Sequence, residues 1–137
     1  MKVKIEMETL QTVDGSTEVL RHAAAGLRRE RQDGCTIVNF SLDSIHNELQ
    51  IDRIRNTVTV TRNHAQQEQI RYEKGLHHQV DYQTPAGAMK LGFKTERVEI
   101  SEERGTGILH ILLLYGMTQF DTPVADCELR ITVSPFG

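Results

Sequence analysis

Tryptophan is absent from the chain, and aromatic residues make up only 5% of its 137 residues. So small an aromatic share argues against a stacking platform for single-stranded nucleic acid. Neither positive nor negative charge is in large excess, because the net charge is only −3 at pH 7. A charge of this size gives no general attraction to nucleic acid or to anionic membranes. We therefore expect no nucleic-acid partner and no membrane partner.

Long hydrophobic runs and cysteine motifs are missing as well. No stretch reaches the roughly 18 apolar residues of a membrane-spanning helix, and residues 1–6 lack the apolar core of a secretory signal. Cys35 and Cys127 lie far apart without a CxxC companion, so we interpret them as two reduced core residues. Together these features predict a cytoplasmic protein.

What the chain does have is apolar residues at every second position. Residues 3–8 and 125–133 both alternate in this way, with charged residues between the apolar ones. Successive side chains of a β-strand leave opposite faces, so this period indicates strands with one buried face. The longest apolar run, residues 111–115, suits a strand that is buried on both faces.

Turn residues divide the chain into about eight to ten strands. Asp14-Gly15 and Asp33-Gly34 each stand between two strand patterns, and this dipeptide is a strong hairpin signal. We expect a polar connection at residues 44–48, a strand from 68 that is broken or bulged at Gly75 and continues to 84, and a type I turn at 84–87. With a composition of 38% hydrophobic and 26% charged residues, the chain is predicted to form one all-β domain over residues 1–137.

The sequence lacks the motifs of metal sites, nucleophilic enzymes and phosphate-binding loops. His77 and His78 are adjacent, so in a strand they point to opposite faces, and the other histidines lack metal-ligand spacing. No nucleophile elbow or Cys/His arrangement is present. Residues 105–107 precede a strand and are too short for a phosphate loop, and Glu102-Glu103 is interpreted as solvated surface. We expect no metal, no cofactor and no enzymatic activity.

A set of short motifs resembles the YwiB-like family of small uncharacterised bacterial proteins. The similarity lies in residues 58–62 (VTVTR), 72–75 (YEKG), 82–87 (YQTPAG) and Thr95, and in the first half of the chain in Gly15, Glu18-Val19 and Gly26. The resemblance covers essentially the whole chain. It implies a single antiparallel calycin-type (lipocalin-like) β-barrel whose function is unassigned. Its motifs are structural rather than chemical.

The chain departs from that family pattern at two places. Phe40 stands where the family leads us to expect a tyrosine, and Asn63-His64 replaces a turn that often contains glycine. A hydrogen bond in the barrel lumen that depends on the tyrosine hydroxyl is therefore in doubt for this chain.

The phase of each strand suggests which polar side chains enter the barrel. Val58 and Val60 share a face with Arg62, and Met89, Leu91 and Phe93 share a face with Thr95. By this reasoning a set of polar residues enters or borders the lumen: Arg62, Tyr72, His78, Tyr82, Thr84 and Thr95. A buried arginine needs acceptors, because an unpaired buried charge costs several kcal/mol.

Two interpretations of this set remain open. In the first, the set lines a cavity for a small amphipathic or anionic ligand, with Arg62 as the polar anchor. In the second, the same side chains fill the barrel, and the protein acts as an interaction or self-associating module. The two-sided apolar strand over residues 108–115 motivates the second, because its outer face needs a cover. A homo-oligomer would be one such partner.

Overall fold

The computed structural model describes residues 1–63 and 67–136, without the side chain of Gln83. Every regular element within this part is a β-strand, as the alternation predicted. In chain order the strands are β1 (Lys2–Val13), β2 (Ser16–Glu30), β3 (Cys35–Leu42), β4 (Ile45–Asp52), β5 (Thr57–Asn63), β6 (Gln67–Tyr72), β7 (His77–Thr84), β8 (Gly87–Glu102), β9 (Leu109–Gln119) and β10 (Thr122–Pro135).

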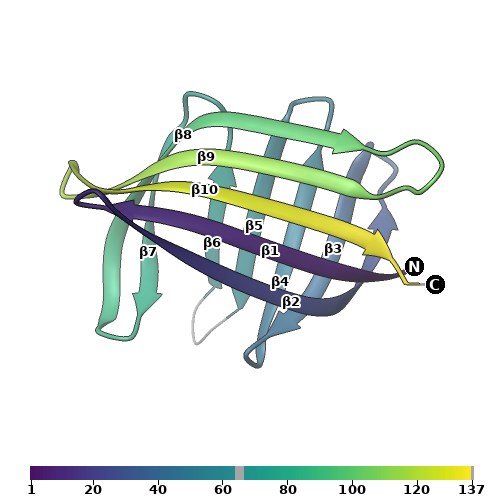
Figure 1. The fold of residues 1–137 in the computed structure, drawn as a ribbon, viewed down its shortest axis with the longest axis horizontal. Helices are drawn as coiled ribbons and strands as arrows, with labels where there is room; N and C mark the ends of the chain where they lie inside the picture. The colour runs from purple at the N-terminus through teal and green to yellow at the C-terminus, as the bar shows by residue number, and fades with distance from the viewer. Residues whose placement is uncertain (64–66, 137) are drawn as a thin grey trace.

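All ten strands belong to one antiparallel sheet with the order β6-β5-β4-β3-β2-β1-β10-β9-β8-β7. In Figure 1, β8, β9, β10, β1 and β2 form a front layer, and β3 to β6 run behind it at a steep angle. The two ends of the sheet, β6 and β7, lie close to each other without forming a ladder. The sheet is therefore a nearly closed barrel, and the prediction of an all-β antiparallel barrel is confirmed.

Tight turns link most neighbouring strands, as the turn residues predicted. Asp14 and Gly15 both have positive φ, which is the geometry of a two-residue hairpin turn. Two details differ from expectation. Residues 45–48 belong to β4 rather than to a polar connection, because Asp43 and Ser44 alone make the turn with positive φ.

The segment around Gly75 is the second difference. Gly75 has a φ of 85° and lies in the connection between two separate strands, β6 and β7, instead of bulging one continuous strand. The backbone N–H of Gly75 donates to the carbonyl of Thr95 at 2.9 Å, and the N–H of Thr95 donates to the carbonyl of Leu76 at 3.0 Å. The connection therefore pairs with β8 and directs the chain across the seam of the barrel.

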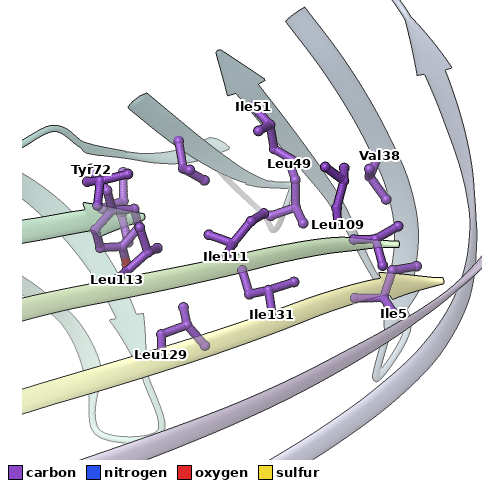
Figure 2. Close-up of a cluster of buried hydrophobic side chains, with 14 of the residues drawn as sticks. Ile5, Val38, Leu49, Ile51, Tyr72, Leu109, Ile111, Leu113, Leu129 and Ile131 are labelled. Carbon is purple, nitrogen blue, oxygen red and sulfur yellow. The ribbon is translucent and has the colours of Figure 1, made fainter. Parts of the chain in front are cut away.

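The core fills the space between the two layers. Side chains from β1, β9 and β10 meet side chains from β3, β4 and β5, and Figure 2 shows them converging. The largest fully buried ones include Ile5, Leu49, Ile51, Leu109 and Ile131. Phe40, which replaces the expected tyrosine, is buried in this core at 4% exposure. The apolar ring of Phe40 needs no hydrogen-bond partner in the core. This chain therefore lacks the hydrogen bond that a tyrosine hydroxyl could make at that position.

Gly26 marks the point at which β2 bends from one layer into the other. A Cβ on this residue would lie 2.4 Å from the carbonyl oxygen of Asn39 and 2.7 Å from Cδ1 of Ile5. Only glycine permits this close approach. Beyond the bend, residues 26–30 of β2 pair with β3, whereas residues 16–25 pair with β1 alone.

Candidate functional site

Arg62, near the end of β5, is the centre of a polar group inside the barrel. Its Nη1 donates a hydrogen bond of 2.6 Å to the hydroxyl of Tyr82 on β7 and lies 3.4 Å from Oε2 of Glu68 on β6. The guanidinium carbon also lies 5.1 Å from the centre of the Tyr82 ring. Glu68 is almost fully buried, at 2% exposure. The requirement for acceptors at Arg62, expected from its phase, is therefore met by a tyrosine and a carboxylate.

An aromatic group continues from this polar group into the barrel. The Tyr72 ring lies 5.0 Å from the Tyr115 ring and 6.4 Å from the Phe93 ring, and the Phe93 ring lies 6.0 Å from the Tyr82 ring. Burial raises the pKa values of Tyr72 and Tyr115, so both hydroxyls stay protonated in ordinary buffers. The group thus offers apolar ring faces and neutral hydroxyls beside one guanidinium.

The other predicted site residues lie at different places around this group. Thr95 is directly opposite Tyr115 in the β8–β9 ladder and is buried at 1% exposure. Among the described residues, the Thr95 hydroxyl oxygen has no hydrogen-bond partner. His78 accepts a hydrogen bond from the backbone N–H of Arg71 through Nδ1 at 3.1 Å, which covers part of the β6 edge. Thr84 bonds to the carbonyl of Gly87 and belongs to the β7–β8 turn rather than to the central group.

Burial of the inward-facing side chains changes along the barrel. Near the two termini these side chains are fully buried, with Val3, Leu109 and Val133 at 0% exposure. Toward β7, Ile70, Leu91 and Phe93 are still buried, but other inward-facing side chains are only partly buried. We call these partly buried residues the open end: Val60, Arg62, Val80, Tyr82, Met89, Tyr115 and Met117. In Figure 1 both termini lie at one end of the front layer, and β7 lies at the other end. Arg62, Tyr82 and Tyr115 are therefore the members of the polar and aromatic group that lie where the interior meets solvent.

A second arginine, Arg28 on β2, lies at the opposite end and was missed as a candidate. Arg28 belongs to the densest basic run of the chain, residues 28–31, yet it is only 6% exposed. It donates to Glu30 at 2.9 Å, to the carbonyl of Gly107 at 2.9 Å and to Glu102 at 2.7 Å. Glu102 is exposed, as the interpretation of Glu102-Glu103 as solvated surface expected, and its hydrogen bond from Arg28 holds the pKa of its carboxyl below the ordinary value. The alternation of β2 could have indicated that Arg28 faces inward, because Arg28 lies on the same face of the strand as Ala24 and Gly26.

The outer face of β9, which motivated the interaction hypothesis, is only half-buried. Leu112 stands between Arg130 of β10 and Glu99 of β8, and Leu114 is flanked in the same way by Glu128 and Arg97. Long charged side chains can cover apolar neighbours with their aliphatic stems. The leucines are therefore less in need of an external partner than the apolar run suggested.

The described residues also bear on metal sites and on membrane-spanning helices. Among the described residues, no group of three or more histidine, cysteine or acidic side chains is arranged to hold a metal ion. The described part of the chain also contains no helix of the length and apolarity that crossing a membrane requires. Cys35 and Cys127 are both free and buried, and burial raises the pKa of each thiol. His64 lies outside the described residues.

Comparison with known proteins identifies the family. Residues 5–131 match the model of a domain of unknown function, DUF1934. The chain belongs to this family. Among solved structures, the crystal structure of the ywiB protein from Bacillus subtilis is similar, with a TM-score of 0.81 over 99% of this chain and 92% of that one. A comparison with curated proteins gave no match.

The structural similarity confirms the YwiB-like resemblance drawn from the motifs at residues 58–62, 72–75 and 82–87. The two chains are only 16% identical, so the similarity supports a shared fold and does not carry residue roles from one chain to the other. Any function of the open end must therefore be argued from its own side chains.

Proposed function

We propose that this DUF1934 protein is a cytoplasmic β-barrel that binds a small amphipathic molecule at its open end. The observation that carries the proposal is a group of apolar and polar inward-facing side chains near β7 that are only partly buried, whereas the inward-facing side chains near the termini are fully buried. Ligand sites in proteins combine apolar walls with a few fixed polar groups. The open end has this composition, with Val60, Val80, Met89 and Met117 beside Arg62 and Tyr82.

The polar group favours a ligand with an acidic or strongly accepting head. Arg62 already shares Nη1 between the Tyr82 hydroxyl and the Glu68 carboxylate. A carboxylate or sulfonate of a ligand would replace the neutral tyrosine as acceptor, and a charged acceptor makes the stronger bond to a guanidinium. Glu68 keeps the guanidinium oriented and lowers its net attraction for anions, so we expect modest affinity.

The buried hydroxyl of Thr95 supports the same location. A buried hydroxyl without a partner costs about 1–3 kcal/mol, so such groups are usually satisfied by water or by a ligand. Thr95 pairs with Tyr115, which borders the open end. A ligand or an ordered water that enters beside Tyr115 would supply the missing partner.

An anionic fluorescent probe tests the proposal on the full-length protein. We expect 8-anilinonaphthalene-1-sulfonate to bind with saturable fluorescence, close to one site per chain. Arg62→Gln should weaken binding at least about fivefold, because it removes the charged donor. Val80→Phe should weaken binding without changing any charge, because the larger ring fills the open end. Native mass spectrometry of protein from its own host would detect a natural ligand that stays bound.

Arg130→Gln is the matched control. Arg130 pairs with Glu128 at 3.0 Å on the outer face of the sheet, away from the interior. This variant should bind the probe as the unmodified protein does. An equal loss in Arg62→Gln and Arg130→Gln would show that the probe follows surface charge, and unsaturable fluorescence from the unmodified protein would refute an interior site.

A further inference from the structure

The N-terminal part of β2, residues 16–25, has a free edge. It forms a ladder with β1 on one side, and β3 takes up pairing on the other side only from Gly26 onward. Among the described residues, no other strand pairs with this edge. In Figure 1 β2 is the lower border of the front layer, below β1. The edge results from the bend at Gly26, which carries the rest of β2 into the rear layer.

Alternation of hydrogen bonds decides which backbone groups point outward along this edge. The backbone N–H of Arg28 donates a hydrogen bond to the carbonyl of Met1 at 2.8 Å, and the amino group of Met1 donates one to the carbonyl of Arg28 at 3.1 Å. In an antiparallel ladder every second residue bonds to the same neighbour, so the even-numbered residues of β2 bond to β1. The N–H and C=O groups of the odd-numbered residues therefore point away from β1: Thr17, Val19, Arg21, Ala23 and Ala25.

The side chains along the edge do little to prevent pairing with another strand. Exposed edges are usually protected by charged side chains, lysine above all, by proline or by a bulge. Residues 16–25 contain no lysine, proline or bulge, and of their two charged side chains, Glu18 and Arg21, Arg21 is already paired with Glu8 of β1 at 2.9 Å. Apolar side chains are instead exposed on both faces of the strand. Val19 is 42% exposed on the outer face, and Leu20 is 38% exposed on the inner face.

We propose that this edge of β2 pairs antiparallel with the same edge of a second copy of the chain. A two-fold axis normal to the sheet would place Leu20 opposite its own copy. In this register Glu18 faces the His22 of the other copy, and Val19 faces its Arg21. Opposite-charge and hydrogen-bonding cross-strand pairs are stabilising. Moving the two-fold axis by one residue along β2, which shifts the register by two residues, would place Arg21 opposite Arg21, so the charges select the Leu20-centred pairing.

Sedimentation velocity and hydrogen exchange test this dimer on the full-length chain. Between about 1 and 300 µM we expect the unmodified protein to move from monomer to dimer. Leu20→Glu places two carboxylates face to face at the axis and should raise the dissociation constant at least about tenfold. Val19→Pro removes an N–H that points to the free edge and leaves the β1 ladder bonded, so it should have the same effect.

Val124→Glu is the matched control, because Val124 is an exposed valine on β10 with 37% exposure, close to that of Leu20. It should dimerise as the unmodified protein does, and circular dichroism should show that all variants fold. In the dimer, the amides of Val19, Arg21 and Ala23 should exchange more slowly at high protein concentration. A strict monomer would overturn the proposal, as would a dimer in which these amides remain unprotected or which Leu20→Glu and Val19→Pro leave intact.

Discussion

Replacement of Arg28 by alanine should be among the most destabilising single changes to a charged residue of this protein. The guanidinium joins β2 to the β8–β9 turn through its bonds to Glu30, Glu102 and the Gly107 carbonyl. Removal of one partner from a buried ion pair costs about 3–5 kcal/mol. The side chains of Glu30 and Glu102 are 56% and 30% exposed, so water can solvate both after the change. We therefore expect the lower limit, about 3 kcal/mol.

Urea denaturation measures this loss as a lower midpoint with an unchanged slope. A double-mutant cycle with Glu102→Gln should give a coupling energy of about 1–2 kcal/mol, because the two groups are in direct contact at 2.7 Å. Arg130→Ala is the control: this exposed arginine also pairs with a glutamate, and its loss should cost less than about 1 kcal/mol. Equal costs for Arg28→Ala and Arg130→Ala, or a coupling near zero, would refute the reasoning.

The same contact predicts a pH dependence. Its hydrogen bond with Arg28 holds the pKa of Glu102 below its ordinary value of 4.5. A lowered folded-state pKa adds stability that is complete above about pH 5 and is lost as pH falls through the folded-state value. Arg28→Ala removes the largest cause of the lowered pKa and leaves only the weaker contribution of Arg53. The variant should therefore lose less stability than the unmodified protein between about pH 5 and pH 3, measured by urea denaturation at each pH.

Three further predictions follow from single sites. Gly26→Ala should destabilise the fold by about 2–3 kcal/mol in urea, because its Cβ would contact a backbone carbonyl at 2.4 Å. Cys35 and Cys127 should react with Ellman's reagent at pH 8 at least about 100-fold more slowly in the folded protein than in urea, because burial raises both pKa values. Asp52→Asn should flatten the loss of stability below about pH 4, because backbone N–H groups of the β4–β5 turn hold the Asp52 pKa below its ordinary value.

Much of the barrel was predictable because each strand carries its own evidence. Alternation in β1 and β10 indicates a buried face without knowledge of any partner, and Asp14-Gly15 indicates the hairpin between β1 and β2. The strand phase also placed Arg62 and Tyr82 on the interior, where they are hydrogen-bonded. These features depend on local backbone geometry, which the sequence encodes directly.

The errors concern features that depend on pairing between distant strands. Gly75 looked like a bulge because nothing local shows that the chain after it leaves β6 and pairs with β8. Glu68 shares the phase of Ile70 and Tyr72, but a carboxylate on an apolar face is interpretable only when Arg62 is known to lie opposite it in the β5–β6 ladder. Phase alone could have identified Arg28 and Glu68 as inward-facing charges, whereas their partners required the fold.

Comparison of the two interior arginines explains why one is assigned to stability and the other to binding. Arg28 is 5% exposed in its side chain and bonds to two carboxylates and a backbone carbonyl from three parts of the chain. Arg62 is 22% exposed in its side chain and donates a 2.6 Å hydrogen bond to the neutral hydroxyl of Tyr82. An incoming anion gains more by displacing a neutral acceptor from Arg62 than by displacing two carboxylates from the buried Arg28. The two ends of the barrel therefore differ in how readily their arginine can change partners, which is why we propose the ligand at the end near β7.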